Sequence, residues 1–187
     1  MRELLRQVRR TPERLLHPLR RRKAIDALQA RTRPKTLLVI CHGNICRSPV
    51  AAGLLRRALA PTGIAVESAG LIGFNRPAPP EAVGAAACHG LDLSAHRSRL
   101  ATVDLVRTAD LIVVMELSQQ RQICERYGRR MADVLILGDL DPQPVDTRTI
   151  RDPVTDKRDV FDQVYARVAR CVRELASILA PAGVISA

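Results

Sequence analysis

One short stretch joins an apolar run to a helix-like segment, and it constrains the fold more than any other part of the chain. The run Leu37–Ile40 is typical of a buried strand, and helix-like sequence follows Pro49, a residue suited to the first position of a helix. The loop between them reads Cys-His-Gly-Asn-Ile-Cys-Arg-Ser. Backbone N–H groups in such a loop converge where a helix N-terminus holds an anion. The stretch therefore predicts an α/β fold with a phosphate-binding loop after its first strand.

The loop also carries a nucleophile. Converging N–H dipoles and a nearby guanidinium favour the thiolate of Cys41, which is the nucleophilic form. Arg47 can bind two phosphoryl oxygens as a fork, and Ser48 can donate a hydrogen bond to the sulfur. Gly43 and Asn44 suit the positive backbone φ that a tight turn needs. We expect the loop to wrap a tetrahedral oxyanion through His42, Gly43, Asn44, Ile45, Cys46 and Ser48.

Strand-like and helix-like segments alternate along the rest of the chain. This alternation favours a parallel sheet, and ligands of such sheets bind beyond the carboxyl ends of the strands, where Cys41 lies. One domain of about 150 residues is of ordinary size, so we place a single catalytic domain at 35–187. The strand-like runs are Thr36–Cys41, Ile64–Ser68, Asp110–Met115 and Val134–Leu137, and the helix-like segments are Val50–Leu59, Pro80–His89, Leu117–Tyr127 and Val160–Leu179.

The loop resembles the signature loop of the low-molecular-weight protein tyrosine phosphatases, and the likeness continues in order through most of residues 35–180. The resemblance implies a four-stranded parallel twisted sheet flanked by helices on both faces. It also implies hydrolysis of phosphotyrosine in proteins through a phosphocysteine intermediate, with no metal or other cofactor. The positions that match the family's nucleophile, phosphate-binding arginine and general acid are Cys41, Arg47 and Asp152.

The general acid has to be chosen between two Asp-Pro pairs, which begin at Asp141 and Asp152 within the turn-rich segment 138–159. The second pair is followed by a short turn and the helix-like segment Val160–Leu179, which matches the family's pattern. We therefore expect Asp152 to protonate the leaving oxygen, and then to act as base for the water that hydrolyses the phosphocysteine. The alternative is that Asp152 only forms a turn.

Two further residues resemble the family's supporting network. His96 lies in the run Asp92–Arg99, which is similar to the family segment whose histidine joins the loop asparagine and serine in a hydrogen-bond network. Ser68 matches a serine of the same network. We expect both to brace Asn44 and Ser48 rather than touch the substrate, the alternative for His96 being a surface loop.

Specificity is predicted from positions around the loop. Phe74 falls where many members place an aromatic wall beside the phosphotyrosine ring, although it would also suit a simple core position. Ile45 resembles the tyrosine-directed members, since phosphoarginine-directed relatives tend to carry threonine there. Many relatives also have aromatic residues after the catalytic Asp-Pro, where this chain has Val154 and Thr155. Phosphotyrosine is therefore the first choice of substrate, in a pocket with one aliphatic side.

Arsenate reductase is the alternative chemistry, because some enzymes with this loop reduce arsenate through a relay of cysteines. Those relatives place a cysteine soon after the third strand, and this chain has none there. Cys46 is close enough in sequence to Cys41 to form a protective reversible disulfide. The other cysteines fall at helix-like positions, where we expect buried apolar residues, at Cys88, Cys124 and Cys171.

The amino-terminal segment differs in composition from the rest. Residues 1–34 hold eleven Arg or Lys and three Asp or Glu, a net charge of +8 out of +11 for the chain. Leucines at 4, 5, 15, 16, 19 and 28 suggest amphipathic helices, which Pro12 and Pro18 are expected to keep short. Such an arm could lie on anionic lipid, dock on an acidic partner such as the tail of a bacterial tyrosine kinase, or pack on its own domain.

Composition also bears on location and on non-enzymatic functions. The essential free thiolate and the lack of a secretory or spanning segment favour a cytoplasmic protein, peripheral at the inner membrane face if the arm binds lipid. A non-catalytic protein that binds polyanions or membranes through its arginines is the remaining alternative. Nucleic acid is an unlikely partner, because aromatic residues make up only 2% of the chain and stacking platforms are missing.

Overall fold

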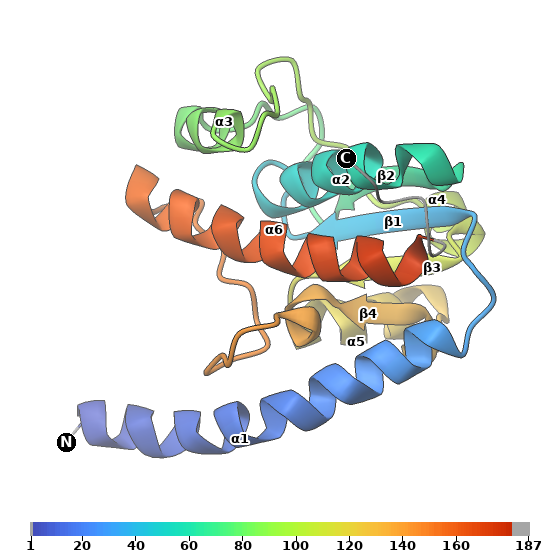
Figure 1. The fold of residues 1–187 in the computed structure, drawn as a ribbon. Coiled ribbons are helices and arrows are strands. Elements are labelled where there is room, and N and C mark those ends of the chain that lie inside the picture. Colours follow the sequence, from blue (N-terminus) through green and yellow to red (C-terminus); the bar gives the residue numbers. More distant parts are fainter. Residues whose placement is uncertain (1, 181–187) are drawn as a thin grey trace.

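The computed structural model describes residues 2–180 and contains one parallel sheet with helices on both faces (Figure 1). The strand order is β2-β1-β3-β4, so the strand that precedes the loop is central. The strands are β1 Thr36–Cys41, β2 Ala65–Gly70, β3 Leu111–Val114 and β4 Val134–Ile136. The helices are α1 Arg2–Gln29, α2 Arg47–Leu59, α3 Pro80–Ala87, α4 Val103–Thr108, α5 Leu117–Tyr127 and α6 Arg158–Leu179, with short 3-10 turns η1 Ala60–Thr62, η2 Met131–Asp133 and η3 Leu137–Leu140.

The alternation of side chains along β1 builds two cores. Leu37 and Val39 pack into one cluster with residues of α2 and α6, whereas Leu38 and Ile40 pack into a second cluster with residues of α4 and α5. Because both faces of the strand are covered, its sequence is a continuous apolar run. The predicted fold class, with its four parallel strands in these places, is confirmed.

Two element boundaries near the loop differ from the prediction. Helix α2 begins at Arg47 rather than at Pro49, with Cys46 as its N-cap. Proline is tolerated anywhere in a first helical turn, because the N–H groups there have no intrahelical partner. Strand β2 continues past Ser68, because Ala69 and Gly70 pair with the last two residues of β1. The short helix α4 was not predicted, and it buries only Val106, which leaves no periodic pattern to read.

Helix α1 is continuous through Pro12 and Pro18, so the prediction that these residues keep the helices short is wrong. Figure 1 shows it as the long helix along the lower edge of the molecule. An interior proline costs a helix about 3 kcal/mol, and packing of the second half of α1 against η3 and α6 offsets this. Leu28 on α1 is buried in the main core. No helix within residues 2–180 is both long enough and apolar enough to cross a bilayer.

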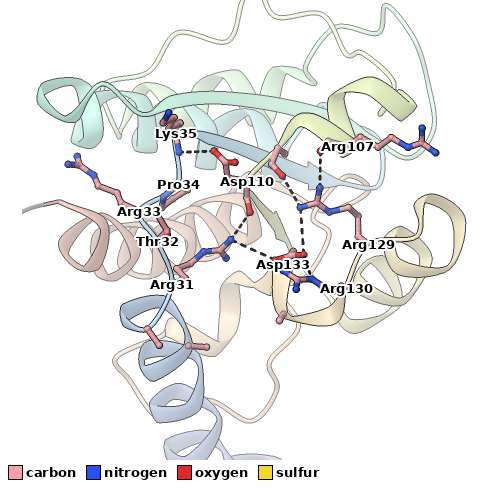
Figure 2. Close-up of a pocket in the computed structure, with 14 residues that line it drawn as sticks. Arg31, Thr32, Arg33, Pro34, Lys35, Arg107, Asp110, Arg129, Arg130 and Asp133 are labelled. Carbon is pink, nitrogen blue, oxygen red and sulfur yellow. Dashed lines mark hydrogen bonds and ion pairs between the residues drawn. The ribbon is translucent and has the colours of Figure 1, made fainter.

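The junction between α1 and β1 encloses a hollow of about 690 Å³ at the amino ends of β1 and β3, the opposite edge of the sheet from Cys41 (Figure 2). Asp110 closes it by accepting hydrogen bonds from the backbone N–H groups of Lys35 (2.8 Å) and Thr36 (2.9 Å). Arg31 donates to the carbonyl oxygen of Asp110 at 2.6 Å. These contacts hold the pKa of the Asp110 carboxyl below its ordinary value, the Lys35 N–H contributing most. The hollow is therefore where the arm is anchored to the domain.

Candidate active site

The loop between β1 and α2 folds around the sulfur of Cys41. The backbone N–H of Asn44 donates to Sγ at 3.3 Å, and the Ser48 hydroxyl lies 3.0 Å from the same sulfur. Asn44 has a φ of 51°, as predicted, whereas Gly43 is not among the residues with positive φ, so that part of the prediction is wrong. The steric demand for glycine falls instead on Gly70 at the end of β2, where a Cβ would lie 2.9 Å from the backbone of Gly43.

The side chain of Asn44 organises the loop from behind. Its amide group donates to the hydroxyl oxygens of Ser48 (2.9 Å) and Ser68 (3.0 Å), and its Oδ1 accepts from the N–H of Arg99 (3.0 Å). Nε2 of His96 donates to the Asn44 carbonyl oxygen at 2.7 Å. Ser68 and His96 therefore lie where the sequence predicted, although His96 reaches Ser48 only through Asn44. The Ser48 hydroxyl oxygen accepts from Asn44, and its own proton can point to the Cys41 sulfur at 3.0 Å, where it would stabilise a thiolate, or to the carbonyl oxygen of Ala69 at 3.4 Å.

Arg47 is buried, with 1% of its surface exposed, and it joins the loop to the segment after η3. Nη1 donates to the carbonyl oxygen of Ile150 at 3.0 Å, and Nη2 forms an ion pair with the carboxylate of Asp152. Glu116, which follows β3, lies 4.0 Å from Nη1. The Nε–H of Arg47 is buried without a partner in the described part of the chain, which suits a residue that awaits an anionic ligand.

The structure separates the two Asp-Pro pairs by their surroundings. The carboxylate of Asp141 is fully buried and accepts hydrogen bonds from the guanidinium groups of Arg167 and Arg170. Asp152 contacts Arg47 of the loop, and its side chain remains about one-third exposed. Asp141 is thus saturated by structural contacts, and Asp152 is the aspartate that stands at the loop.

The cysteines outside position 41 have different environments. Burial raises the pKa of the Cys46 thiol far above its ordinary value, and the neighbouring Cys41 and Asp152 add to the shift. A protonated thiol is a poor nucleophile, so Cys46 is ill-suited to attack, and its disulfide with Cys41 stays a prediction. Cys171 is buried as predicted. The same prediction is wrong for Cys88, which lies exposed at the C-cap of α3, and for Cys124, which is partly exposed on α5.

The mouth of the site is formed by the segment after β2. The N–H groups of Leu71 and Ile72 donate to the carbonyl oxygen of His42 at 2.8 and 3.0 Å, which ties this segment to the loop. Phe74 follows and is 73% exposed, so it is not a core residue. Ile45, in contrast, is buried in the main core rather than open to a ligand. Val154, on the aliphatic side, is partly exposed.

Arg76 also stands at the mouth, and the sequence analysis did not single it out. Its Nη1 lies 3.7 Å from the point where a Cβ on Gly43 would stand, and its Cδ lies 3.0 Å from the corresponding point on Gly73. Gly73 has a φ of 78°, so a side chain there would be strained as well as crowded. Ser98 holds the backbone of Arg76 in place, because its N–H donates to the Arg76 carbonyl oxygen at 2.9 Å and its hydroxyl oxygen accepts from the Arg76 N–H at 3.0 Å. Its position after Phe74 is the only signal in the sequence, and it is weak because exposed arginines are frequent in this chain.

The described residues do not form a metal centre. Among the side chains that the structure describes, those of residues 13–180, no group of three or more His, Cys, Asp and Glu is placed to hold a metal ion. The geometry instead combines a thiol, a buried guanidinium and a partly exposed carboxylic acid. These three groups suffice for nucleophilic displacement on a bound oxyanion.

Comparisons with known proteins agree with this geometry. Residues 36–183 match the model of the family described as low molecular weight phosphotyrosine protein phosphatase. The chain is 42% identical over 139 residues to the probable low molecular weight protein-tyrosine-phosphatase EpsP of Ralstonia solanacearum, which covers 74% of this chain and 91% of that protein.

Solved structures of related phosphatases share the fold of this chain. The tyrosine phosphatase Wzb from Escherichia coli K30, in complex with sulphate, has a TM-score of 0.70 and 33% identity over 79% of this chain and 99% of that one. The YwlE arginine phosphatase from Geobacillus stearothermophilus has a TM-score of 0.70 and 26% identity over 78% and 93% of the two chains. Helix α1 lies wholly outside the region matched by the family model.

Proposed function

Because this chain belongs to the low molecular weight phosphotyrosine protein phosphatase family, and is therefore a phosphatase, we propose that Cys41, Arg47 and Asp152 carry its reaction. The thiolate of Cys41 attacks phosphorus in line as the bond to the leaving oxygen breaks, and Asp152 gives its proton to that oxygen. Asp152 then takes a proton from the water that hydrolyses the phosphocysteine, which returns the thiolate and releases inorganic phosphate. Arg47 and the loop N–H groups hold the equatorial oxygens throughout.

The contact between Arg47 and Asp152 is the observation that carries this assignment. It brings together two residues 105 positions apart in the sequence, one on the anion-binding loop and one on an otherwise turn-rich segment. A phosphate that binds the guanidinium fork competes for the hydrogen bond that Asp152 accepts from Nη2 of Arg47. Substrate binding thereby releases the carboxyl group to face the leaving oxygen.

The substrate that we propose is a phosphotyrosine side chain of a protein. An exposed Phe74 at the mouth can stack against a phenyl ring, and the tyrosine phosphatase relatives are more similar in sequence than the arginine phosphatase is. Arsenate reduction is less well supported, because the segment Met115–Leu117 after β3 carries no thiol to continue a relay.

Matched phosphopeptides provide the test. We expect metal-free protein in EDTA to release phosphate from a phosphotyrosine peptide with a higher kcat/KM than from a phosphoarginine peptide of the same sequence. The reverse preference, or arsenate reduction with a thiol donor faster than either hydrolysis, would replace the proposal. The protein partner can be captured with Asp152→Ala, and we expect a tyrosine-phosphorylated protein such as a bacterial tyrosine kinase.

For the arm we propose contact with the anionic inner face of the cytoplasmic membrane. Leu15 and Leu19 are 72% and 66% exposed on α1, and the net charge of +8 over residues 1–34 favours anionic lipid. Phosphatidylglycerol vesicles should sediment the protein, and phosphatidylcholine vesicles should not. The double change Leu15→Glu and Leu19→Glu should abolish this, whereas Val103→Glu, an exposed change on the domain, should not. Binding that survives the double change would show that the exposed leucines do not carry it, and failure of the wild-type protein to sediment with phosphatidylglycerol would leave an acidic protein as the partner.

A further inference from the structure

The second half of α1 packs against the segment that leads to Asp152. His17 on α1 is buried, and its Nε2 lies 2.9 Å from the carbonyl oxygen of Asp141. A carbonyl oxygen can only accept, so Nε2 carries the hydrogen and donates it. The arm therefore reaches, through one buried hydrogen bond, the residue that begins the segment 141–152.

Asp141 is held from two sides. Its carbonyl oxygen is bound by His17 of α1, while its carboxylate is bound by Arg167 and Arg170 of α6 at 3.0 to 3.2 Å. A buried carboxylate with two cationic partners is fixed in place, because any movement leaves buried charges unpaired. Helices α1 and α6 themselves are linked by the ion pair between Arg21 and Glu174.

Charged side chains extend the contact along the same segment. Arg20 and Glu13 form an ion pair on α1, and Arg148 of the segment forms one with Asp139 of η3. The Arg20 hydrogen bond lowers the pKa of Glu13, and Arg148 adds to the effect from across the interface. Glu13 in turn raises the pKa of Arg20, with a smaller contribution from Asp139. Arg20, Asp139 and Arg148 line one hollow between α1 and η3, so the two ion pairs lie close together.

Close contacts hold the backbone between this interface and Asp152. The backbone of Arg148 approaches Gly138 so closely that a Cβ on Gly138 would collide with its carbonyl oxygen. Arg167 donates to the carbonyl oxygens of Thr147 (2.7 Å) and Thr149 (2.8 Å). Ile150 then binds Arg47, two residues before Asp152.

We propose that α1 is a positioning element for Asp152, and that His17 is the residue through which it acts. Docking of the arm holds the segment 141–152 in the one arrangement that aims Asp152 at the leaving oxygen. The inference rests on the proposed role of Asp152 as general acid. It makes the arm a positioning element for the reaction of this chain, although the arm lies wholly outside the region that the family model matches.

Leaving-group dependence tests the proposal, because proton donation to the leaving oxygen makes kcat/KM less sensitive to the pKa of the leaving group, and loss of that donation makes it more sensitive. In the full chain, His17→Ala should lower kcat/KM for phenyl phosphate by about tenfold, and for 2,4-dinitrophenyl phosphate by less than about twofold. The matched control is Arg22→Ala on the same helix, an exposed residue that pairs with Asp26 of that helix, and it should leave both values unchanged.

The ion pair of Arg21 with Glu174 gives a second and independent series. Arg21→Glu should steepen the leaving-group dependence, and the double variant with Glu174→Arg should restore it, since the pair is reformed with exchanged charges. This series decides the question if His17→Ala fails to fold. Wild-type dependence in His17→Ala and Arg21→Glu, whatever happens to their melting temperatures, overturns the positioning role. Wild-type dependence in Asp152→Ala refutes the proposed general acid instead.

Discussion

The catalytic loop and the acid segment 138–152 reach the same site by different routes. In the loop, the bonds among Cys41, Asn44 and Ser48 join residues 3 to 7 positions apart. In the acid segment, Asp141 and Asp152 accept local hydrogen bonds from the backbone N–H groups of Gln143 and Val154, but every side chain that donates to them comes from a residue 26 to 124 positions away. A nucleophile can therefore be encoded locally, whereas the acid depends on contacts that the whole fold assembles.

The largest effect should come from a substitution in the catalytic loop. Cys41→Ser should lower kcat for p-nitrophenyl phosphate by about 10⁴-fold or more, because the hydroxyl is not ionised at neutral pH. Cys88→Ser, an exposed change on α3, should leave kcat unchanged. Equal rates in Cys41→Ser and wild type would remove the loop from the chemistry.

Substitution of Asp152 should lower activity, whereas substitution of Asp141 should lower stability. Asp152→Ala should lower kcat/KM for phenyl phosphate by about 10²- to 10³-fold with little effect on stability. Asp141→Asn should lower the free energy of unfolding by about 3–5 kcal/mol, because it leaves Arg167 and Arg170 without their buried partner. Urea titrations and steady-state kinetics separate the two outcomes. If Asp141→Asn were the more severe kinetic variant and remained stable, the assignment would be reversed.

A smaller effect should distinguish backbone from side chain within the loop. Asn44→Ala removes three side-chain hydrogen bonds. It also leaves an alanine, which has a Cβ, at a φ of 51°. Asn44→Gly removes the same bonds but accepts the φ freely, so it should be about 1 kcal/mol more stable than Asn44→Ala. Both should lose about tenfold in kcat/KM if the bonds orient Ser48. A wild-type rate in Asn44→Gly would mean that only the backbone geometry matters.

The smallest effect is expected at the mouth of the site, where Arg76 is exposed. Arg76→Glu should raise KM about fivefold for a phosphotyrosine peptide with acidic neighbours, and less for p-nitrophenyl phosphate, because an exposed ion pair contributes at most about 1 kcal/mol. Arg107→Glu on α4, at the opposite edge of the sheet, is the matched control. Equal changes in KM for the peptide and for p-nitrophenyl phosphate would show that Arg76 does not bind the acidic neighbours in the peptide.

The same contrast explains what could be predicted from the sequence. The loop, the four strands and the choice of Asp152 follow from local pattern and family resemblance, and the structure places Ser68 and His96 beside Asn44 as expected. The roles of Asp141 and His17 could not be predicted, because each depends on partners from distant helices. The continuity of α1 was missed for a related reason, since packing on the domain outweighs the local effect of Pro18.

The central claim is that Cys41 becomes phosphorylated and that Asp152 serves the steps around it. The most direct measurement is acid quenching of Asp152→Ala during turnover of 2,4-dinitrophenyl phosphate, followed by mass spectrometry of the peptides. The substrate's good leaving group allows the first step without the acid, and loss of the base slows hydrolysis of the intermediate. We predict a phosphoryl group on Cys41 alone. A phosphoryl group on Cys46 or on any other residue, or none under conditions of measurable turnover, would contradict the account.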